Sequence, residues 1–216
     1  MTLKVVIGFI NVLSGRLPEW LIQQSKFSDM QEDIKKALEI LQNGGVILYP
    51  TDTIWGLGCD ATSEVAVKKI YEIKKRADTR SMLVLMENIN LLDRYVEEVP
   101  EIAYDLIEVS EKPITIIYPK GKNLAPNLLA QDGTIGIRIT SEEFTRQLIQ
   151  RFRKPIVSTS ANISGSPSPA TFNDISDEIR QVADYIVSYR QDDVTPASPS
   201  SIIKLGPGGE IKIIRK

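Results

Sequence analysis

Apolar residues recur at helical spacing in several stretches of the chain. Those between residues 34 and 41 share one helical face, and Asn43-Gly44-Gly45 stops that helix before the apolar run 46–49. Ser63 is a suitable N-cap for a second helix, and Thr140 with Glu143 forms an expected capping box for a third. The helical stretches after 34–41 are 63–74, 88–99, 101–110, 140–152 and 175–182.

Short apolar runs and strict alternation predict strands between these helices. Arg138 is expected on the strand face opposite Ile137 and Ile139, unless both faces of that strand are buried. The strand stretches are 46–49, 82–86, 114–118, 135–139, 155–157 and 185–189, with a final hairpin of 200–205 and 210–215 around a glycine-rich turn. Since helices and strands alternate along the chain, the expected fold class is a single α/β domain.

Composition narrows the chemistry that the chain can perform. Its 216 residues suffice for one sizeable core, and a formal charge of -2 argues against a protein that coats nucleic acid without specificity. One cysteine, Cys59, excludes an internal disulfide framework and favours the cytoplasm. The complete absence of histidine excludes Ser-His-Asp triads and histidine-based zinc sites. Positioned cations, carboxylates, hydroxyls and backbone dipoles remain.

The first 29 residues form an expected extension of unknown role before a domain at 30–216. Their apolar run, 5–13, is too short to span a bilayer, so no membrane association is expected. Met30 could serve as a start codon. An extra strand or hairpin packed on the domain is an equally open interpretation of residues 1–29.

Two polar segments suggest a nucleotide site. In an extended segment 158–162, the side chains of Ser158, Ser160 and Asn162 would face one way, and Lys74 continues the apolar stripe of its helix toward the interior or a cleft. Hydroxyls and fixed cations together can hold a triphosphate. Two ordinary interpretations stay open: the cations 74–76 could lie in solvent at a helix end, and 158–162 could be a turn that satisfies its own backbone.

A set of short motifs stands in a definite order along the chain. They are Gly44-Gly45, Pro50-Thr51-Asp52-Thr53-Ile54-Trp55-Gly56-Leu57-Gly58, Lys74-x-Arg76, Gly136-Ile137-Arg138, Ser158-Thr159-Ser160-Ala161-Asn162 with Ser164-Gly165, and Pro167-Ser168-Pro169. In this order and spacing, residues 31–216 resemble the YrdC/Sua5 family, the threonylcarbamoyl-AMP synthases. The resemblance implies a twisted mixed β-sheet flanked by helices, with an open concave face that holds the site.

The resemblance also implies a nucleotidyltransferase reaction. L-Threonine, bicarbonate and ATP would give threonylcarbamoyl-adenylate and pyrophosphate, for the N6-threonylcarbamoyl modification of adenosine in tRNA. ATP would be a substrate, Mg²⁺ would be bound mainly through its phosphates, and no metal ligand from the protein is expected. The partners would be tRNA or the machinery that transfers the threonylcarbamoyl group to it.

The motifs carry roles onto particular residues. The resemblance assigns threonine binding to Thr53, Arg138, Ser158 and Ser200. It assigns ATP or its phosphates to Arg76, Arg80, Thr134, Ser160, Asn162, Ser168 and Arg215, and a catalytic role to Lys74 and Arg76. Asp52 is a candidate general base on residue type alone.

Two other functions fit the same residues. One is a module that binds double-stranded RNA or tRNA through its basic residues. The other is a paralogue that makes a different carbamoyl-adenylate, as in hydrogenase maturation. The chain resembles the short form of the family, without the carboxy-terminal Sua5 domain.

Overall fold

A mixed β-sheet of nine strands forms the centre of the chain, whose computed structural model describes residues 18–75, 82–206 and 208–216. The strand order is β7-β1-β2-β6-β3-β5-β4-β8-β9. Three neighbouring pairs, β1/β7, β3/β5 and β4/β8, are parallel, and the other pairs are antiparallel. The strands are β1 (Ile47–Tyr49), β2 (Gly56–Gly58), β3 (Leu83–Met86), β4 (Ile114–Tyr118), β5 (Ile135–Ile139), β6 (Ile156–Ser160), β7 (Tyr185–Ile186), β8 (Ser201–Leu205) and β9 (Ile211–Arg215).

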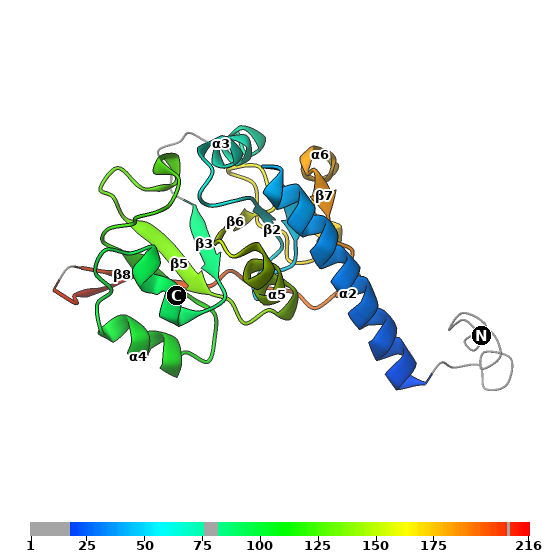
Figure 1. Ribbon diagram of the computed structural model, residues 1–216, viewed down its shortest axis with the longest axis horizontal. Helices are drawn as coiled ribbons and strands as arrows, with labels where there is room; N and C mark the ends of the chain where they lie inside the picture. Colours follow the sequence, from blue (N-terminus) through cyan, green and yellow to red (C-terminus); the bar gives the residue numbers. More distant parts are fainter. Residues whose placement is uncertain (1–17, 76–81, 207) are drawn as a thin grey trace, which may run out of the picture.

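Side-chain alternation divides the sheet into two faces with different covers. In β3, Val84 and Met86 join the larger apolar core, whereas Leu85 joins a smaller one and Leu83 lines a cavity. Helices α3 (Glu64–Ile73), α4 (Ile102–Val109) and α6 (Asp177–Val182) contribute to the larger core, and α2 (Glu19–Gln42) and α5 (Glu143–Phe152) to the smaller. Figure 1 shows α2 and α5 side by side in front of the sheet. The two helices do not cover the cavity, because its lining includes no residue of a described α-helix.

The long helix α2 crosses the domain boundary expected from the sequence. It runs unbroken from Glu19 to Gln42, and Met30 is buried in the smaller core. Residues 19–29 are therefore helical, so the strand or hairpin that was one open interpretation of residues 1–29 does not occur within 19–29; residues 1–17 lie outside the described part. Within the described residues, no helix combines the length and apolar character needed to span a bilayer.

Two predicted helix features are wrong. The stretch 88–99 is a 3₁₀ helix only over Ile89–Arg94, because the next residues turn to the loop at 120–122: Glu97 N donates to the Lys120 carbonyl at 3.0 Å, and Lys122 N to the Tyr95 carbonyl at 2.9 Å. The expected Thr140–Glu143 capping box is also absent. Its place is taken by Glu142, whose carboxylate accepts from Thr145 N at 2.7 Å.

Strand lengths at two places depart from the sequence prediction. The stretch 185–189 is a strand only over Tyr185–Ile186, because the N–H groups of Ser188 and Tyr189 donate to the buried carboxylate of Asp33, at 3.2 and 2.7 Å, instead of to a strand. The stretch 155–157 is longer than predicted, since β6 continues through Ser160 and pairs with β2 there. The polar residues 158–160 thus belong to the sheet rather than to a loop.

Candidate active site

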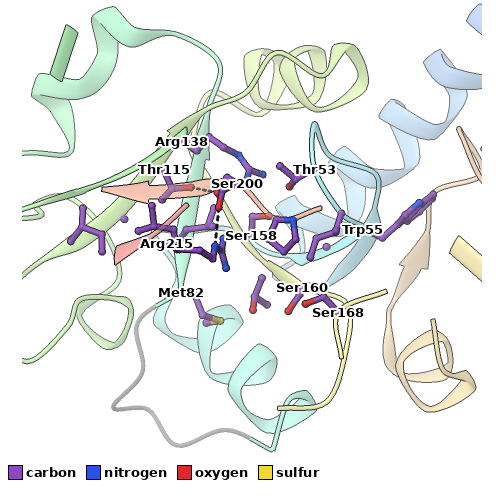
Figure 2. A pocket seen from close by; sticks show the side chains of 18 residues that line it. Thr53, Trp55, Met82, Thr115, Arg138, Ser158, Ser160, Ser168, Ser200 and Arg215 are labelled. Carbon is purple, nitrogen blue, oxygen red and sulfur yellow. Dashed lines mark hydrogen bonds between the residues drawn. The ribbon is translucent and has the colours of Figure 1, made fainter. Parts of the chain in front are cut away.

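A cavity of about 260 Å³ opens on the face of the sheet to which Leu83 belongs. Register explains its floor: Ser158 and Gly136 lie on either side of Leu83 in one row across β6, β3 and β5. Gly136 has no side chain, so no side chain of its own fills the floor at that point. The sequence-predicted residues that line the cavity are Thr53, Arg138, Ser158, Ser160, Ser168, Ser200 and Arg215, which Figure 2 shows as sticks.

Arg138 is the buried cation of the cavity floor. Strand β5 is buried on both faces, so Arg138 points into the cavity and its side chain is only 3% exposed. Its Nη2 lies 3.0 Å from Asp52 Oδ1, and the Asp52 side chain is 6% exposed. Burial lowers the pKa of the Arg138 guanidinium, and the Asp52 carboxylate opposes this by raising it. Among the described residues, Arg138 Nε has no hydrogen-bond partner.

The Arg138 guanidinium is a candidate binding group for a small anion, because it lines the cavity and Asp52 engages only one of its ends. A buried donor without an acceptor is costly, and a planar guanidinium offers two parallel N–H groups to a carboxylate. Asp52 occupies the Nη2 end of the group only through an ion pair without hydrogen-bond alignment. A small anion in the cavity would satisfy the remaining donors.

Thr53 and Ser158 bring hydroxyls to the cavity from two separate elements. The loop after β1 is held by Thr51, whose Oγ1 accepts from Thr53 N at 3.0 Å, donates to the Ile54 carbonyl at 2.8 Å and lies 3.0 Å from Thr53 Oγ1. Ser158 stands on β6 beside Gly56, where a Cβ would lie 3.2 Å from Ser158 Oγ. A side chain at position 56 would crowd this hydroxyl, because β2 approaches it closely.

Ser200 and Arg215 close the opposite side of the cavity. Arg215 Nε donates to the Ser200 carbonyl at 2.9 Å, and Ser200 Oγ lies 2.8 Å from Thr115 Oγ1 on β4, as the dashed lines of Figure 2 show. Burial lowers the pKa of Arg215, whose guanidinium faces the cavity as a second cation.

Lys74 supports the site from behind and is absent from the cavity lining. It is 2% exposed, and its Nζ donates to the carbonyls of Ser160 at 2.6 Å and Asn162 at 2.7 Å. Asn162 is likewise outside the lining: its side-chain oxygen accepts from Ser160 Oγ, and its Nδ2 donates to the Ser166 carbonyl. Lys74 therefore points inward as the helical stripe predicted, and it fixes the course of the chain after β6.

Other sequence-predicted residues lie outside the cavity or outside the described part. The Thr134 hydroxyl donates to Asp132 Oδ1 at 2.6 Å, and Lys204 Nζ donates to the other carboxylate oxygen at 2.9 Å, so Thr134 belongs to a separate cluster. Arg76 and Arg80 fall in 76–81, outside the described residues, and their roles stay predictions. Within the part described, no group of three or more His, Cys, Asp or Glu side chains could hold a metal ion.

Several lining residues were not predicted from the sequence as site residues, and three of them have large or polar side chains that shape the cavity. Thr115, Trp55 and Met82 all line the cavity. Trp55 packs against Phe172, with ring centroids 4.8 Å apart, and forms a wall. Trp55 lies within a motif that the sequence already singled out, whereas Thr115 and Met82 stand in apolar strand stretches and carry no signal of their own.

Comparisons with known proteins agree with this architecture. The family model Sua5/YciO/YrdC, with the description "Telomere recombination", matches residues 39–216. Threonylcarbamoyl-AMP synthase of Psychromonas ingrahamii is 36% identical over 137 residues, which cover 62% of this chain and 72% of that protein. The enzyme of the same name from Pseudoalteromonas translucida is 33% identical over 160 residues, covering 73% and 86%.

Solved structures share the fold. The crystal structure of E. coli YciO has a TM-score of 0.74 at 27% identity and covers 86% of this chain and 89% of that one. P. abyssi Sua5 complexed with L-threonine has a TM-score of 0.69 at 27% identity and covers 80% of this chain. The chain spans about half of that Sua5 protein, since the match covers 50% of it. With its mixed sheet, its helices and the family match over residues 39–216, the chain belongs to the YrdC/Sua5 family.

Proposed function

We propose that this protein is an L-threonylcarbamoyladenylate synthase, which condenses L-threonine, bicarbonate and ATP to threonylcarbamoyl-AMP and pyrophosphate. The observation that carries the proposal is the buried Arg138 with an unpaired Nε–H, in a cavity lined by the hydroxyls of Thr53, Ser158 and Ser200. This arrangement suits the carboxylate and hydroxyl of a small amino acid. Its support from relatives is the name of the 36% identical enzyme and the L-threonine bound by P. abyssi Sua5.

The size of the cavity suits an amino acid better than a whole nucleotide. Its 260 Å³ falls just below the roughly 300–1,000 Å³ of pockets that enclose drug-sized ligands. Threonine would bind on the floor at Arg138, and the α-phosphate of ATP would meet it at the rim, near Ser160 and Arg215. Arg76 and Arg80 are proposed to hold the remaining phosphates, with Mg²⁺ carried by the nucleotide.

The chemistry requires placement more than a proton relay. Bicarbonate supplies carbon dioxide by losing hydroxide, the unprotonated amine of threonine adds to that carbon dioxide to form a carbamate, and the proton that the amine loses combines with the hydroxide as water. A carbamate oxygen then attacks the α-phosphorus in line. The new bond is P–O, the bond between the α-phosphorus and the bridging oxygen breaks, and pyrophosphate leaves with its electron pair. Arg215 would stabilise the developing charge, and exclusion of water by the bound substrates would strengthen that interaction. Asp52 is engaged with Arg138, so its assignment as a general base gains no support.

The test is pyrophosphate release from purified protein with ATP, Mg²⁺ and bicarbonate, with and without L-threonine. Release that depends on threonine, and that Arg76→Ala abolishes in a folded protein, is the expected result. Release with carbamoyl phosphate in place of threonine and bicarbonate would indicate the paralogous reaction. Intact ATP under all conditions, together with salt-dependent tRNA binding, would indicate an RNA-binding module.

A further inference from the structure

Two buried hydroxyls form an isolated pair at one end of the cavity floor. Thr115 and Ser200 are 2% and 3% exposed, and both line the cavity. Their Oγ atoms are 2.8 Å apart, and either can be the donor. Neither hydroxyl has another hydrogen-bond partner among the described residues. One proton of the pair lies between the two oxygens, so the other proton and the remaining lone pairs are available to a ligand.

Strand pairing fixes this pair in place. Thr115 is opposite Ile202 in the parallel pairing of β4 with β8, so Ser200 just precedes the strand beside it. The Ser200 carbonyl also accepts from Arg215 Nε at 2.9 Å, which restrains the backbone that carries the hydroxyl. The Ser200 hydroxyl itself is oriented by Thr115 alone among the described residues.

The Thr115–Ser200 pair lies next to Arg138, because Thr115 is on β4 and Arg138 is on the neighbouring strand β5. Ile116 pairs with Ile137 and Ile117 with Gly136, and the same antiparallel register, extended by one residue beyond the paired positions, puts Thr115 opposite Arg138. Side chains in such a pair have Cβ atoms about 4.5–5.5 Å apart. An amino acid whose carboxylate binds Arg138 therefore brings the substituents of its Cα and Cβ within reach of the hydroxyl pair.

We propose that Thr115 is a positioning residue that determines specificity: it orients the Ser200 hydroxyl to recognise the β-hydroxyl of the amino-acid substrate. The inference rests on the proposed function, because it takes the substrate to be an amino acid bound through Arg138. A β-hydroxyl can donate to one oxygen of the pair and accept the free proton. Valine, the isostere with a methyl group in place of the hydroxyl, would leave these buried groups unpaired, and such sites discriminate strongly.

The test compares Thr115→Val, which keeps the shape and removes the hydroxyl, with Thr115→Ser, which keeps the hydroxyl. Thr195→Val makes the same chemical change at an exposed residue outside the cavity and serves as the control. For each protein, kcat and KM are measured with L-threonine and L-valine by pyrophosphate release, and binding of both amino acids by calorimetry. Circular dichroism melting establishes that each variant is folded.

Thr115→Val should lower the threonine-over-valine ratio of kcat/KM by about tenfold to a hundredfold, mainly through the KM for threonine. Thr115→Ser and Thr195→Val should keep the ratio within about threefold of the wild type. A folded Thr115→Val protein with an unchanged ratio would overturn the inference. Wild-type protein that binds threonine without releasing pyrophosphate would refute the proposed function alone, because the binding ratios still test Thr115. Wild-type protein that binds no threonine would overturn both.

Discussion

Replacing Asp52 by asparagine should destabilise the protein strongly, because it removes one charge from a buried ion pair. The substitution keeps the size of the side chain and one of its oxygens. It leaves the Arg138 guanidinium, with an exposed fraction of 3%, without the carboxylate that lies 3.0 Å away. A buried cation without a counter-charge retains most of its desolvation cost.

The size of the expected loss in unfolding free energy follows from the burial of the Asp52–Arg138 pair. Breaking a buried pair costs about 3–5 kcal/mol, and the low end applies because asparagine keeps a dipole at the site. A loss of about 3 kcal/mol is a large part of the roughly 5–15 kcal/mol that stabilises a domain. At about 2–4 °C per kcal/mol for a chain of this size, the melting temperature should fall by about 6–12 °C.

The assay is urea and thermal unfolding of Asp52→Asn beside a matched control. Glu97→Gln breaks the pair with Lys120, whose side chains are 52% and 70% exposed, and should cost less than about 1 kcal/mol. Adding Arg138→Met to Asp52→Asn should recover part of the loss, since no charge is then buried. If Asp52→Asn melts within about 2 °C of the wild type, the reasoning is refuted and Arg138 draws its compensation from elsewhere.

Four more substitutions test other features of the molecule. At Gly58 a Cβ would lie 2.6 Å from a Tyr49 ring carbon, so Gly58→Ala should cost about 1–3 kcal/mol in urea unfolding, whereas at Gly136 the nearest atom is 3.4 Å away. Gly136→Ala should therefore keep the stability but raise the KM for threonine at least about fivefold, and an unchanged KM would argue against the cavity as the threonine site. Lys74→Met should lose about 2–4 kcal/mol in urea unfolding, because two carbonyl groups lose their buried donor; a loss below about 1 kcal/mol would contradict its structural role. The Thr134 hydroxyl and then Lys204 lower the pKa of Asp132 to about 2, so the carboxylate stabilises the fold above the unfolded pKa near 4 and this is lost as the pH falls toward 2. Thr134→Val should raise the pKa of Asp132 in a ¹³C NMR titration, and an unmoved pKa would contradict this cause.

The sequence pattern predicted secondary structure correctly where neighbouring residues determine it. The stripe of α3, the alternation in β5 and the hairpin of β8 and β9 follow from period and turn residues, and the structure confirms them. The helix prediction for 88–99 was wrong because hydrogen bonds to the loop at 120–122 compete with helix formation after Arg94. The strand prediction for 185–189 was too long because the buried carboxylate of Asp33 accepts hydrogen bonds from two N–H groups that a strand would use. Neither partner is near in sequence.

The site residues divide in the same way, into those that a sequence motif marks and those that depend on distant contacts. Thr53, Arg138 and Ser158 could be predicted because each lies in a motif that carries the resemblance to the family, and all three line the cavity. Thr115 could not, since a threonine within an apolar strand is ordinary, and its partner Ser200 is 85 residues away. The inward position of Lys74 followed from its helical stripe, but its carbonyl partners depend on how β6 ends.

The most direct test of the proposed function follows the carbamate carbon. Purified protein is incubated with ATP, Mg²⁺, ¹³C-bicarbonate and L-threonine, and the products are separated rapidly and identified by mass spectrometry, with calorimetry to verify threonine binding. The account predicts threonylcarbamoyl-adenylate with one ¹³C, formed in equal amount with pyrophosphate and only when threonine is present. Threonine that binds while ATP stays intact, or pyrophosphate released without this labelled product, would contradict it.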